Sequence, residues 1–244
     1  MTQNKTQVNL KNRIIVALDT ADFTQAKSLV KTLKRDVPIF KIGSELFTAC
    51  GPRAIQMVRE SGREVFLDLK FHDIPNTVHR SVRAAIQYEV AMLTIHVSGG
   101  LRMMQEACVA AADEAQKKNL ELPKLIGVTL LTSLSEEDVK NEIGLSKPIQ
   151  ETVLRYAGLA QRAGLDGIVA SAFEIKRIRE HYGPDFLIVT PGVRPEGASR
   201  DDQERVLTPK EAFDLGASYI VMGRPITQAT SPADAMARVI QSLT

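Results

Sequence analysis

Short apolar runs rich in β-branched residues alternate, along the whole chain, with longer stretches whose apolar residues recur at helical spacing. This repeated change of period predicts successive βα units and a parallel sheet, because parallel neighbours need a crossover connection that is usually a helix. The runs predicted to be strands are residues 14–19, 39–43, 65–70, 92–97, 124–131, 167–171, 186–192 and 219–223.

Helical spacing is clearest after the first and the fourth of these runs. Each of the two stretches carries one apolar face, which we expect to be buried in the core. The faces consist of Phe23, Ala26, Val30 and Leu33 in the first stretch, and of Leu101, Met104, Cys108 and Ala111 in the second.

Residues typical of helix ends lie between the runs. Pro52 is expected to open the second helix and Asn76 to cap the third. Gly164 and Gly183 are expected where the fifth and sixth helices end. Residues 208–211, Thr-Pro-Lys-Glu, match a capping box with proline in the first turn.

The order of elements favours one domain. Eight successive βα units in 244 residues are typical of a (β/α)₈ TIM barrel, whose active site lies at the C-terminal ends of the strands. An open, doubly wound sheet is the alternative, but the G-x-G-x-x-G turn of a dinucleotide fold is missing after the first run. We expect a flexible tail over residues 1–11 and a single barrel domain over residues 12–244.

Composition excludes several classes of function. The net charge is only +2, from 31 basic and 29 acidic residues, and no Lys/Arg block predicts a nucleic-acid partner. Cys50 and Cys108 have no metal-ligand spacing and are expected to be thiols in a reducing compartment. No apolar run approaches the roughly 18 residues of a membrane span, so we expect a cytoplasmic protein without a membrane partner.

Charged residues gather where the first strands are predicted to end. Asp19, Lys41, Asp68 and Lys70 belong to three neighbouring runs, and alternating signs would let each ammonium offset two carboxylates. For any single residue a stabilising ion pair is the plain alternative. Together they could hold one lysine charged as a proton donor.

Glycine and arginine follow the last two strands. Gly192 ends the seventh run and Arg194 comes two residues later, while Gly223 ends the eighth run and Arg224 follows it directly; barrels of this kind bind phosphate in these loops. Two ordinary turns that contain arginine are the alternative. The long polar segments 132–146 and 194–206 could act as lids, or could be surface loops without a function.

The histidines are less informative. His96 is suited to a supporting role at the strand end, although a hydrogen-bonded core histidine is equally compatible with its position. The direction of His72 depends on where its strand ends, which the sequence leaves open. No spacing of histidines and carboxylates indicates a metal site.

These motifs resemble those of the orotidine 5′-monophosphate decarboxylase family in its compact bacterial form. The resemblance covers nearly the whole chain and is most specific over residues 68–77, Asp-Leu-Lys-Phe-His-Asp-Ile-Pro-Asn-Thr. The other matching segments are residues 17–19, 40–43, 131–133, 189–194, 202–203 and 223–227.

The resemblance implies an enzyme that decarboxylates orotidine 5′-monophosphate to UMP and CO₂ in pyrimidine synthesis, without a cofactor or a metal. It implies a homodimer of barrels in which Lys41, Asp68, Lys70 and Asp73 form a charged array. Lys70 would protonate C6 of the pyrimidine, and Asp73 would reach into the site of the partner subunit.

The resemblance also assigns substrate contacts. Ribose contacts are expected from Asp19, Lys41 and, across the dimer, Thr77. Thr132 and Ser133 would lie at the pyrimidine, with Asp68 near the departing carboxylate. The remaining contacts, mostly on the phosphate side, would be Pro191, Arg194, Gln203, Gly223 and Arg224.

Two other functions stay open at this point. A Mg²⁺-dependent 3-keto-L-gulonate 6-phosphate decarboxylase would share the Asp-x-Lys-x-x-Asp core of residues 68–73. A non-catalytic, nucleotide-binding barrel would need only the two phosphate loops.

Overall fold

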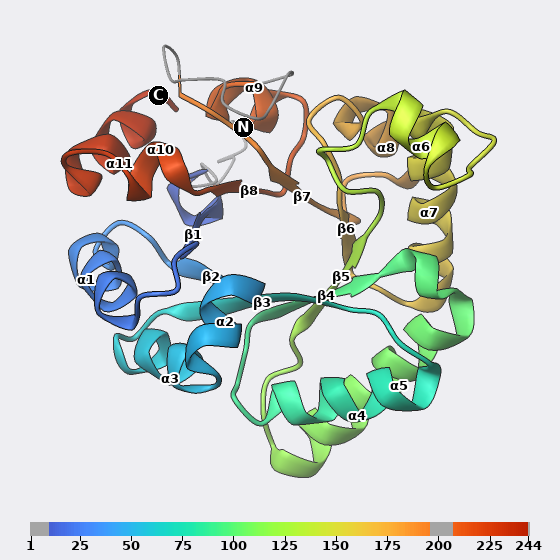
Figure 1. The fold of residues 1–244 in the computed structure, drawn as a ribbon, viewed down its shortest axis with the longest axis horizontal. Coiled ribbons are helices and arrows are strands. Elements are labelled where there is room, and N and C mark those ends of the chain that lie inside the picture. The colour runs from blue at the N-terminus through green and yellow to red at the C-terminus, as the bar shows by residue number, and fades with distance from the viewer. Residues whose placement is uncertain (1–9, 196–206, 244) are drawn as a thin grey trace, which may run out of the picture.

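The strands form a closed barrel. The computed structural model describes residues 10–195 and 207–243. Within these residues, eight parallel strands are paired in sequence order, and the last pairs with the first. Helices surround them on the outside (Figure 1). The (β/α)₈ barrel is therefore confirmed, and an open sheet is excluded.

The strands begin and end within a few residues of the predicted runs. Most differences are at their C-terminal ends, where the polar residues belong to loops. The strands are β1 (Ile14–Ala17), β2 (Ile39–Gly43), β3 (Glu64–Phe71), β4 (Met92–His96), β5 (Lys124–Val128), β6 (Gly167–Val169), β7 (Leu187–Pro191) and β8 (Tyr219–Met222).

Helices follow each strand, and some connections hold two. The α-helices are α1 (Phe23–Leu33), α2 (Ser44–Cys50), α3 (Arg53–Glu60), α4 (Pro75–Ile86), α5 (Leu101–Lys118), α6 (Glu136–Asn141), α7 (Ile149–Ala163), α8 (Ile175–Tyr182), α9 (Pro209–Asp214), α10 (Arg224–Thr227) and α11 (Pro232–Gln241). The 3₁₀ turns are η1 (Leu10–Arg13) and η2 (Val97–Gly99). No helix among the described residues is long and apolar enough to cross a membrane.

Only the last two residues of the predicted tail, residues 1–11, belong to the described part of the chain. Residues 1–9 lie outside the described part of the chain, whereas Leu10 and Lys11 belong to η1. The Lys11 ammonium lies 2.6 Å from the carboxylate of Asp36, just beyond α1.

Two apolar layers hold the barrel together. Residues of one parity on the strands fill the interior, among them Ile15, Ile39, Phe66 and Met92. Residues of the other parity pack outward against the helices. Because side chains alternate along a strand, Asp68 and Lys70 share the inward direction of Phe66, toward the mouth of the barrel.

The predicted helix faces are largely confirmed. Ala26, Val30 and Leu33 of α1, with Met104 and Ala111 of α5, are buried in the layer between strands and helices. Phe23 and Cys108 are partly buried and pack against it. Leu101 was expected in the core but is 36% exposed, and it is the first residue of α5.

Helix ends were predicted with mixed success. Gly164 and Gly183 end α7 and α8 with positive φ, and Thr208 caps α9 through a capping box with Glu211. Asn76 does not cap α4, since Pro75 already occupies the first position of that helix and Asn76 follows it. Pro52 precedes α3, but an additional helix, α2, comes directly after β2.

Arg179 of α8 ties the N-terminal ends of β7 and β8 together. Its guanidinium is partly buried and donates hydrogen bonds at 2.5–3.1 Å to five acceptors. The acceptors are the carbonyl oxygens of Gly183, Pro184, Phe186 and Gly216 and the hydroxyl of Ser218. This end of the barrel is opposite the strand ends that carry the charged residues, and its role is expected to be stability.

Candidate active site

Four charged side chains form a chain of ion pairs at the mouth of the barrel. The Lys41 ammonium lies 3.1 Å from Asp19 and 3.5 Å from Asp68. The Lys70 ammonium lies 2.9 Å from the same oxygen of Asp68, Oδ2. The predicted array of Asp19, Lys41, Asp68 and Lys70 is thus assembled within one chain, with alternating signs.

The array is shielded from water at its centre. The side chains of Lys41 and Asp68 are 13% and 11% exposed, whereas those of Asp19 and Lys70 at the two ends are 50% and 35% exposed. Burial alone would raise the pKa of Asp68. The charges of Lys41 and Lys70, with hydrogen bonds from Lys70 and Thr94, outweigh burial and hold the pKa of Asp68 below its ordinary value.

A small glycine makes room for this arrangement. A Cβ atom at Gly43, at the end of β2, would lie 3.0 Å from the Lys41 ammonium nitrogen and 3.6 Å from Asp19 Oδ1. Any larger residue would therefore crowd the ion pair. The sequence places Gly43 in a matching segment, residues 40–43. The close approach of Lys41 and Asp19, which requires a glycine there, is visible only in the structure.

The end of β3 is irregular. Its pairing with β4 shifts register between Leu67 and Phe71, and Lys70 adopts a positive φ of 52°. Left-handed backbone is unfavourable for residues other than glycine, so neighbouring contacts must hold it. The Lys70 amide donates to the hydroxyl of Thr94 at 2.8 Å, and this hydroxyl donates to Asp68 Oδ1 at 3.0 Å.

Thr94 was not identified from the sequence. It lies in the middle of β4 and is completely buried. One feature of the sequence could have indicated it: Thr94 is a hydroxyl residue within the apolar run Met92–His96, two residues after Met92 and therefore on the same face of the strand.

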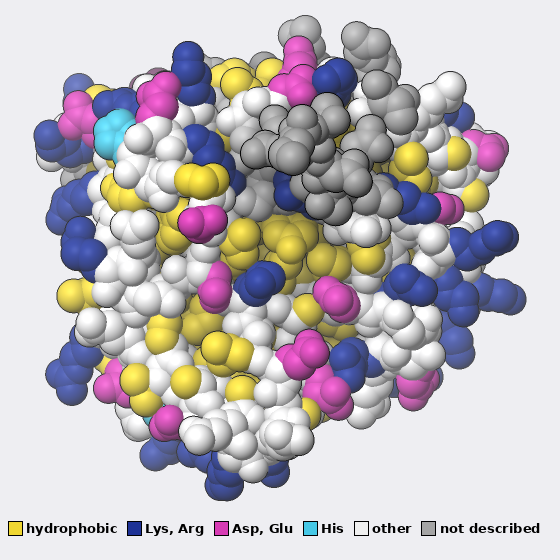
Figure 2. All heavy atoms as spheres, turned by 180° about the vertical axis from the view of Figure 1, so that it is seen from behind, with side chains coloured by type: hydrophobic (Ala, Val, Ile, Leu, Met, Phe, Trp, Pro, Cys, Tyr) yellow, Lys and Arg dark blue, Asp and Glu magenta, His cyan; other side chains and the backbone are white. Residues whose placement is uncertain are grey.

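A cavity of about 270 Å³ opens above the array. Figure 2 shows a hollow on this face, with a hydrophobic floor and with acidic and basic side chains around it. The site residues predicted from the sequence that line the cavity are Asp19, Lys41, Asp68, Lys70, Thr132, Pro191, Arg194, Gly223 and Arg224. Apolar residues complete it, including Phe66, Val128 and Val221.

The β7 and β8 ends form the other side of this cavity. Gly192 has a positive φ of 77°, and Arg194 is only 6% exposed. Gly223 faces Asp19: a Cβ atom there would lie 3.3 Å from Asp19 Oδ2. Arg224 follows as the first residue of α10. Two arginines therefore reach the same cavity from neighbouring strands.

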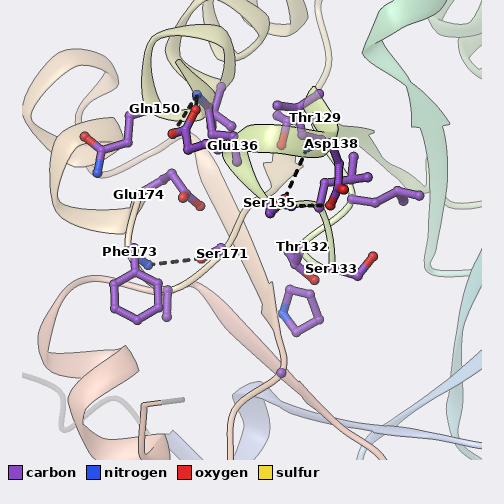
Figure 3. Close-up of a pocket in the computed structure, with 18 of the residues that line it drawn as sticks. Thr129, Thr132, Ser133, Ser135, Glu136, Asp138, Gln150, Ser171, Phe173 and Glu174 are labelled. Atoms are coloured by element: carbon purple, nitrogen blue, oxygen red, sulfur yellow. Dashed lines mark hydrogen bonds between the residues drawn. The ribbon is translucent and has the colours of Figure 1, made fainter. Parts of the chain in front are cut away.

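A second, larger cavity of about 540 Å³ adjoins the first, with which it shares Leu130, Leu131, Thr132, Pro191 and Gly192. Figure 3 shows Thr132 and Ser133 at one end of it and Glu136, Gln150 and Glu174 at the other. Ser133 lines only this larger cavity. The predicted loop 132–146 is partly helical, because it contains α6 with a Ser135–Asp138 capping box.

Besides Ser133, two of the predicted residues that the structure describes do not line the cavity above the array. Asp73 and Thr77 are exposed and are not among the residues that line it, and Asp73 accepts a hydrogen bond from the Ile74 amide at 2.6 Å. Gln203 lies outside the described residues, as does most of the predicted loop 194–206.

The two histidines near the array lie together. β3 ends at Phe71, so His72 belongs to the loop, and its ring centroid is 5.1 Å from that of His96 at the end of β4. Burial, followed by the proximity of His72 and Lys70, lowers the pKa of His96, and Asp68 opposes this only in part. His96 is therefore neutral near pH 7.

Comparisons with known proteins agree with this geometry. The chain is 51% identical to an orotidine 5′-phosphate decarboxylase of Moorella thermoacetica, over 98% of this chain and 94% of that protein. It is 48% identical to the enzyme of that name from Pseudomonas fluorescens, over 94% of this chain and 97% of that protein.

Solved structures give the same result. A crystal structure of orotidine 5′-phosphate decarboxylase from Lactobacillus acidophilus matches with a TM-score of 0.84 and 36% identity, over 96% of this chain and 99% of that one. An uncharacterized conserved protein from Geobacillus kaustophilus matches with a TM-score of 0.82, also at 36% identity, over 95% and 100% of the chains. Residues 12–239 match a family model described as orotidine 5′-phosphate decarboxylase / HUMPS, and the chain belongs to this family.

Proposed function

We propose that this protein is a carboxy-lyase that converts orotidine 5′-monophosphate to UMP and CO₂. The observation that carries the proposal is the Asp19–Lys41–Asp68–Lys70 array at the mouth of the barrel, beside a cavity reached by two arginines. Relatives named orotidine 5′-phosphate decarboxylase align with 94–98% of the chain.

The array suits the chemistry of this reaction. When the bond from C6 to the carboxylate breaks, CO₂ leaves and the electron pair stays on C6, in the ring plane, where the π system cannot delocalise it. A fixed ammonium beside C6 stabilises that charge, and it can then donate the proton that completes UMP. We assign this role to Lys70, which is more exposed to the cavity than Lys41.

Asp68 has two tasks in this mechanism. Its Oδ2 lies 2.9 Å from the Lys70 ammonium and orients this group toward the cavity before the proton is transferred. It also remains ionised, since its pKa is held below its ordinary value, and it would lie near the substrate carboxylate. Repulsion between these two carboxylates would then be relieved as CO₂ leaves.

The other end of the cavity would anchor the substrate. Arg194 and Arg224, with the glycine backbones next to them, would bind the phosphate, and Gln203 would join them. Pro191 and Thr132 would contact the pyrimidine, with Ser133, while Asp19 and Lys41 would bind ribose hydroxyls. Binding energy from the phosphate, remote from C6, can hold the reacting ring against Lys70.

A second copy of the chain would complete the site. Asp73 and Thr77 follow Lys70 on the same segment but are exposed and do not line the cavity of their own chain. A homodimer in which each subunit gives Asp73 and Thr77 to its neighbour would bring them to the substrate. The exposed side chain of Ile74, which is 65% accessible in the single chain, lies between them and suits such a contact.

The loss of orotidine 5′-monophosphate, followed by absorbance with and without excess EDTA, tests the proposal. Turnover that persists in EDTA and is nearly abolished by Lys70→Ala is expected, with UMP binding still measurable. A loss of less than about tenfold would rule out Lys70 as the essential acid. Activity that requires Mg²⁺ and prefers 3-keto-L-gulonate 6-phosphate would assign the chain to the other reaction.

A further inference from the structure

The geometry points to Thr94 as a positioning residue that sets Asp68 and Lys70 for catalysis. This inference rests on the proposed function, because it concerns how the proton donor and its carboxylate are held. Thr94 is completely buried beneath the array and does not line either cavity. It therefore acts through its neighbours and does not touch the substrate.

One hydroxyl contacts both members of the central pair. Thr94 Oγ1 accepts a hydrogen bond from the Lys70 amide at 2.8 Å and donates one to Asp68 Oδ1 at 3.0 Å. A hydroxyl has one proton to donate and two lone pairs, so it can make both bonds at once. The contact fixes Oδ1 of Asp68 and leaves Oδ2 for the two ammonium groups.

The backbone explains why this bond is needed. The shift in register between Leu67 and Phe71 interrupts the regular ladder from β3 to β4 at Lys70. An amide that is partly shielded from water is costly to leave without an acceptor, and the Thr94 side chain supplies the acceptor that the ladder no longer provides. The same bond holds Lys70 at its positive φ of 52°, which directs the start of its side chain.

The consequence concerns turnover more than binding. Without the hydroxyl, Asp68 loses the contact that fixes its Oδ1 and is held only through Oδ2, and the Lys70 backbone loses the contact that holds its left-handed conformation. Ammonium and carboxylate would then spend less time in the productive geometry. The arginines on the opposite side of the cavity, and the anchoring of the phosphate, would be unaffected.

The test compares Thr94→Val with Thr94→Ser in the full-length protein. Valine keeps the shape and removes the hydroxyl, whereas serine keeps the hydroxyl. We expect kcat to fall about tenfold to a hundredfold in Thr94→Val, the size associated with lost hydrogen bonds to charged groups. The KM and the affinity for UMP should change by less than about threefold. Thr94→Ser should keep kcat within about threefold of wild type.

Thr152→Val is the matched control. Thr152 is also buried, and its hydroxyl donates to a backbone carbonyl, that of Lys147, at 3.3 Å, remote from the array. If Thr94 had only a structural role, both valine variants would lose stability and neither would lose kcat. A Thr94→Val enzyme with wild-type kcat would overturn the inference.

Lys70→Ala, measured in parallel, separates this inference from the proposed function. If Lys70→Ala is inactive and Thr94→Val is fully active, only the role of Thr94 is wrong. If Lys70→Ala itself keeps its activity, the proposed mechanism fails first. Should Thr94→Val not fold, Thr94→Cys is compared with Thr94→Ser. The two side chains differ only in having sulfur or oxygen, and a thiol is a weak donor and a weak acceptor. Equal kcat values for the two variants would overturn the inference.

Discussion

Replacement of Arg179 by methionine would remove the guanidinium that links the N-terminal ends of β7 and β8 while keeping most of the apolar stem of the side chain. Arg179 donates to five oxygen atoms, four of them backbone carbonyls. In the variant these carbonyls would have to find water or remain unpaired. We therefore expect a stability loss without a change in the chemistry at the other end of the barrel.

The magnitude follows from the contacts. A hydrogen bond from a charged donor contributes about 1.5–3 kcal/mol, but bonds that share one side chain are not additive, and partly exposed carbonyls recover water. A net loss of about 3 kcal/mol is a reasonable expectation for Arg179→Met. For a chain of this size it corresponds to a decrease in Tm of roughly 6–12 °C.

Thermal and urea unfolding at one fixed protein concentration would measure this loss. Arg177→Met is the matched control, because Arg177 is an exposed residue of the same helix with a single long hydrogen bond of 3.4 Å to Gln150. It should change stability by less than about 0.5 kcal/mol. Equal unfolding curves for Arg179→Met and Arg177→Met would refute the reasoning, and so would a kcat lowered at a temperature where both variants are folded.

Three further predictions concern the site and its surroundings. Arg224→Ala should lower kcat/KM about tenfold to a hundredfold by weakening phosphate binding, as measured by initial rates with orotidine 5′-monophosphate. Mixing inactive Lys70→Ala and Asp73→Ala chains should restore about a quarter of wild-type activity, because half of the dimers would be mixed and each would hold one intact site. Thr190→Val should leave stability unchanged or raise it by up to about 1 kcal/mol in urea unfolding, since the buried Thr190 hydroxyl has no hydrogen-bond partner among the described residues.

Each of these has an outcome that contradicts it. An unchanged kcat/KM in Arg224→Ala would remove Arg224 from the phosphate site. No recovery in a mixture that demonstrably exchanges subunits would argue against a site shared through Asp73. A loss of more than about 1 kcal/mol in Thr190→Val would mean that the hydroxyl has a partner that contributes to stability.

The barrel could be predicted from the sequence because its signals are local and repeated. Apolar runs located all eight strands found in the described residues, and Gly164 and Thr208 marked helix ends through backbone requirements that few other residues satisfy. The start of α4 was predicted wrongly because two signals for a helix start stand next to each other. Asn76 is a typical capping residue, but Pro75 before it is already the first residue of the helix.

The composition of the charged array was also predictable, but its geometry was not. Strand order places Asp19, Lys41 and Asp68 side by side once the sheet is known to be parallel. The irregular end of β3, however, depends on a contact with Thr94 from a strand more than twenty residues later in the chain. Neither the positive φ of Lys70 nor the buried hydroxyl leaves a pattern in the local sequence.

The order of the strands also divides the mouth of the barrel into two halves that carry different side chains. The charged groups assigned to the reaction come from β1, β2 and β3, with support from β4, whereas the arginines come from the ends of β7 and β8. One half would anchor a phosphate and the other would act on what is attached to it. Reactions on other phosphorylated compounds could therefore arise through substitutions confined to the first half, while the anchor is inherited unchanged.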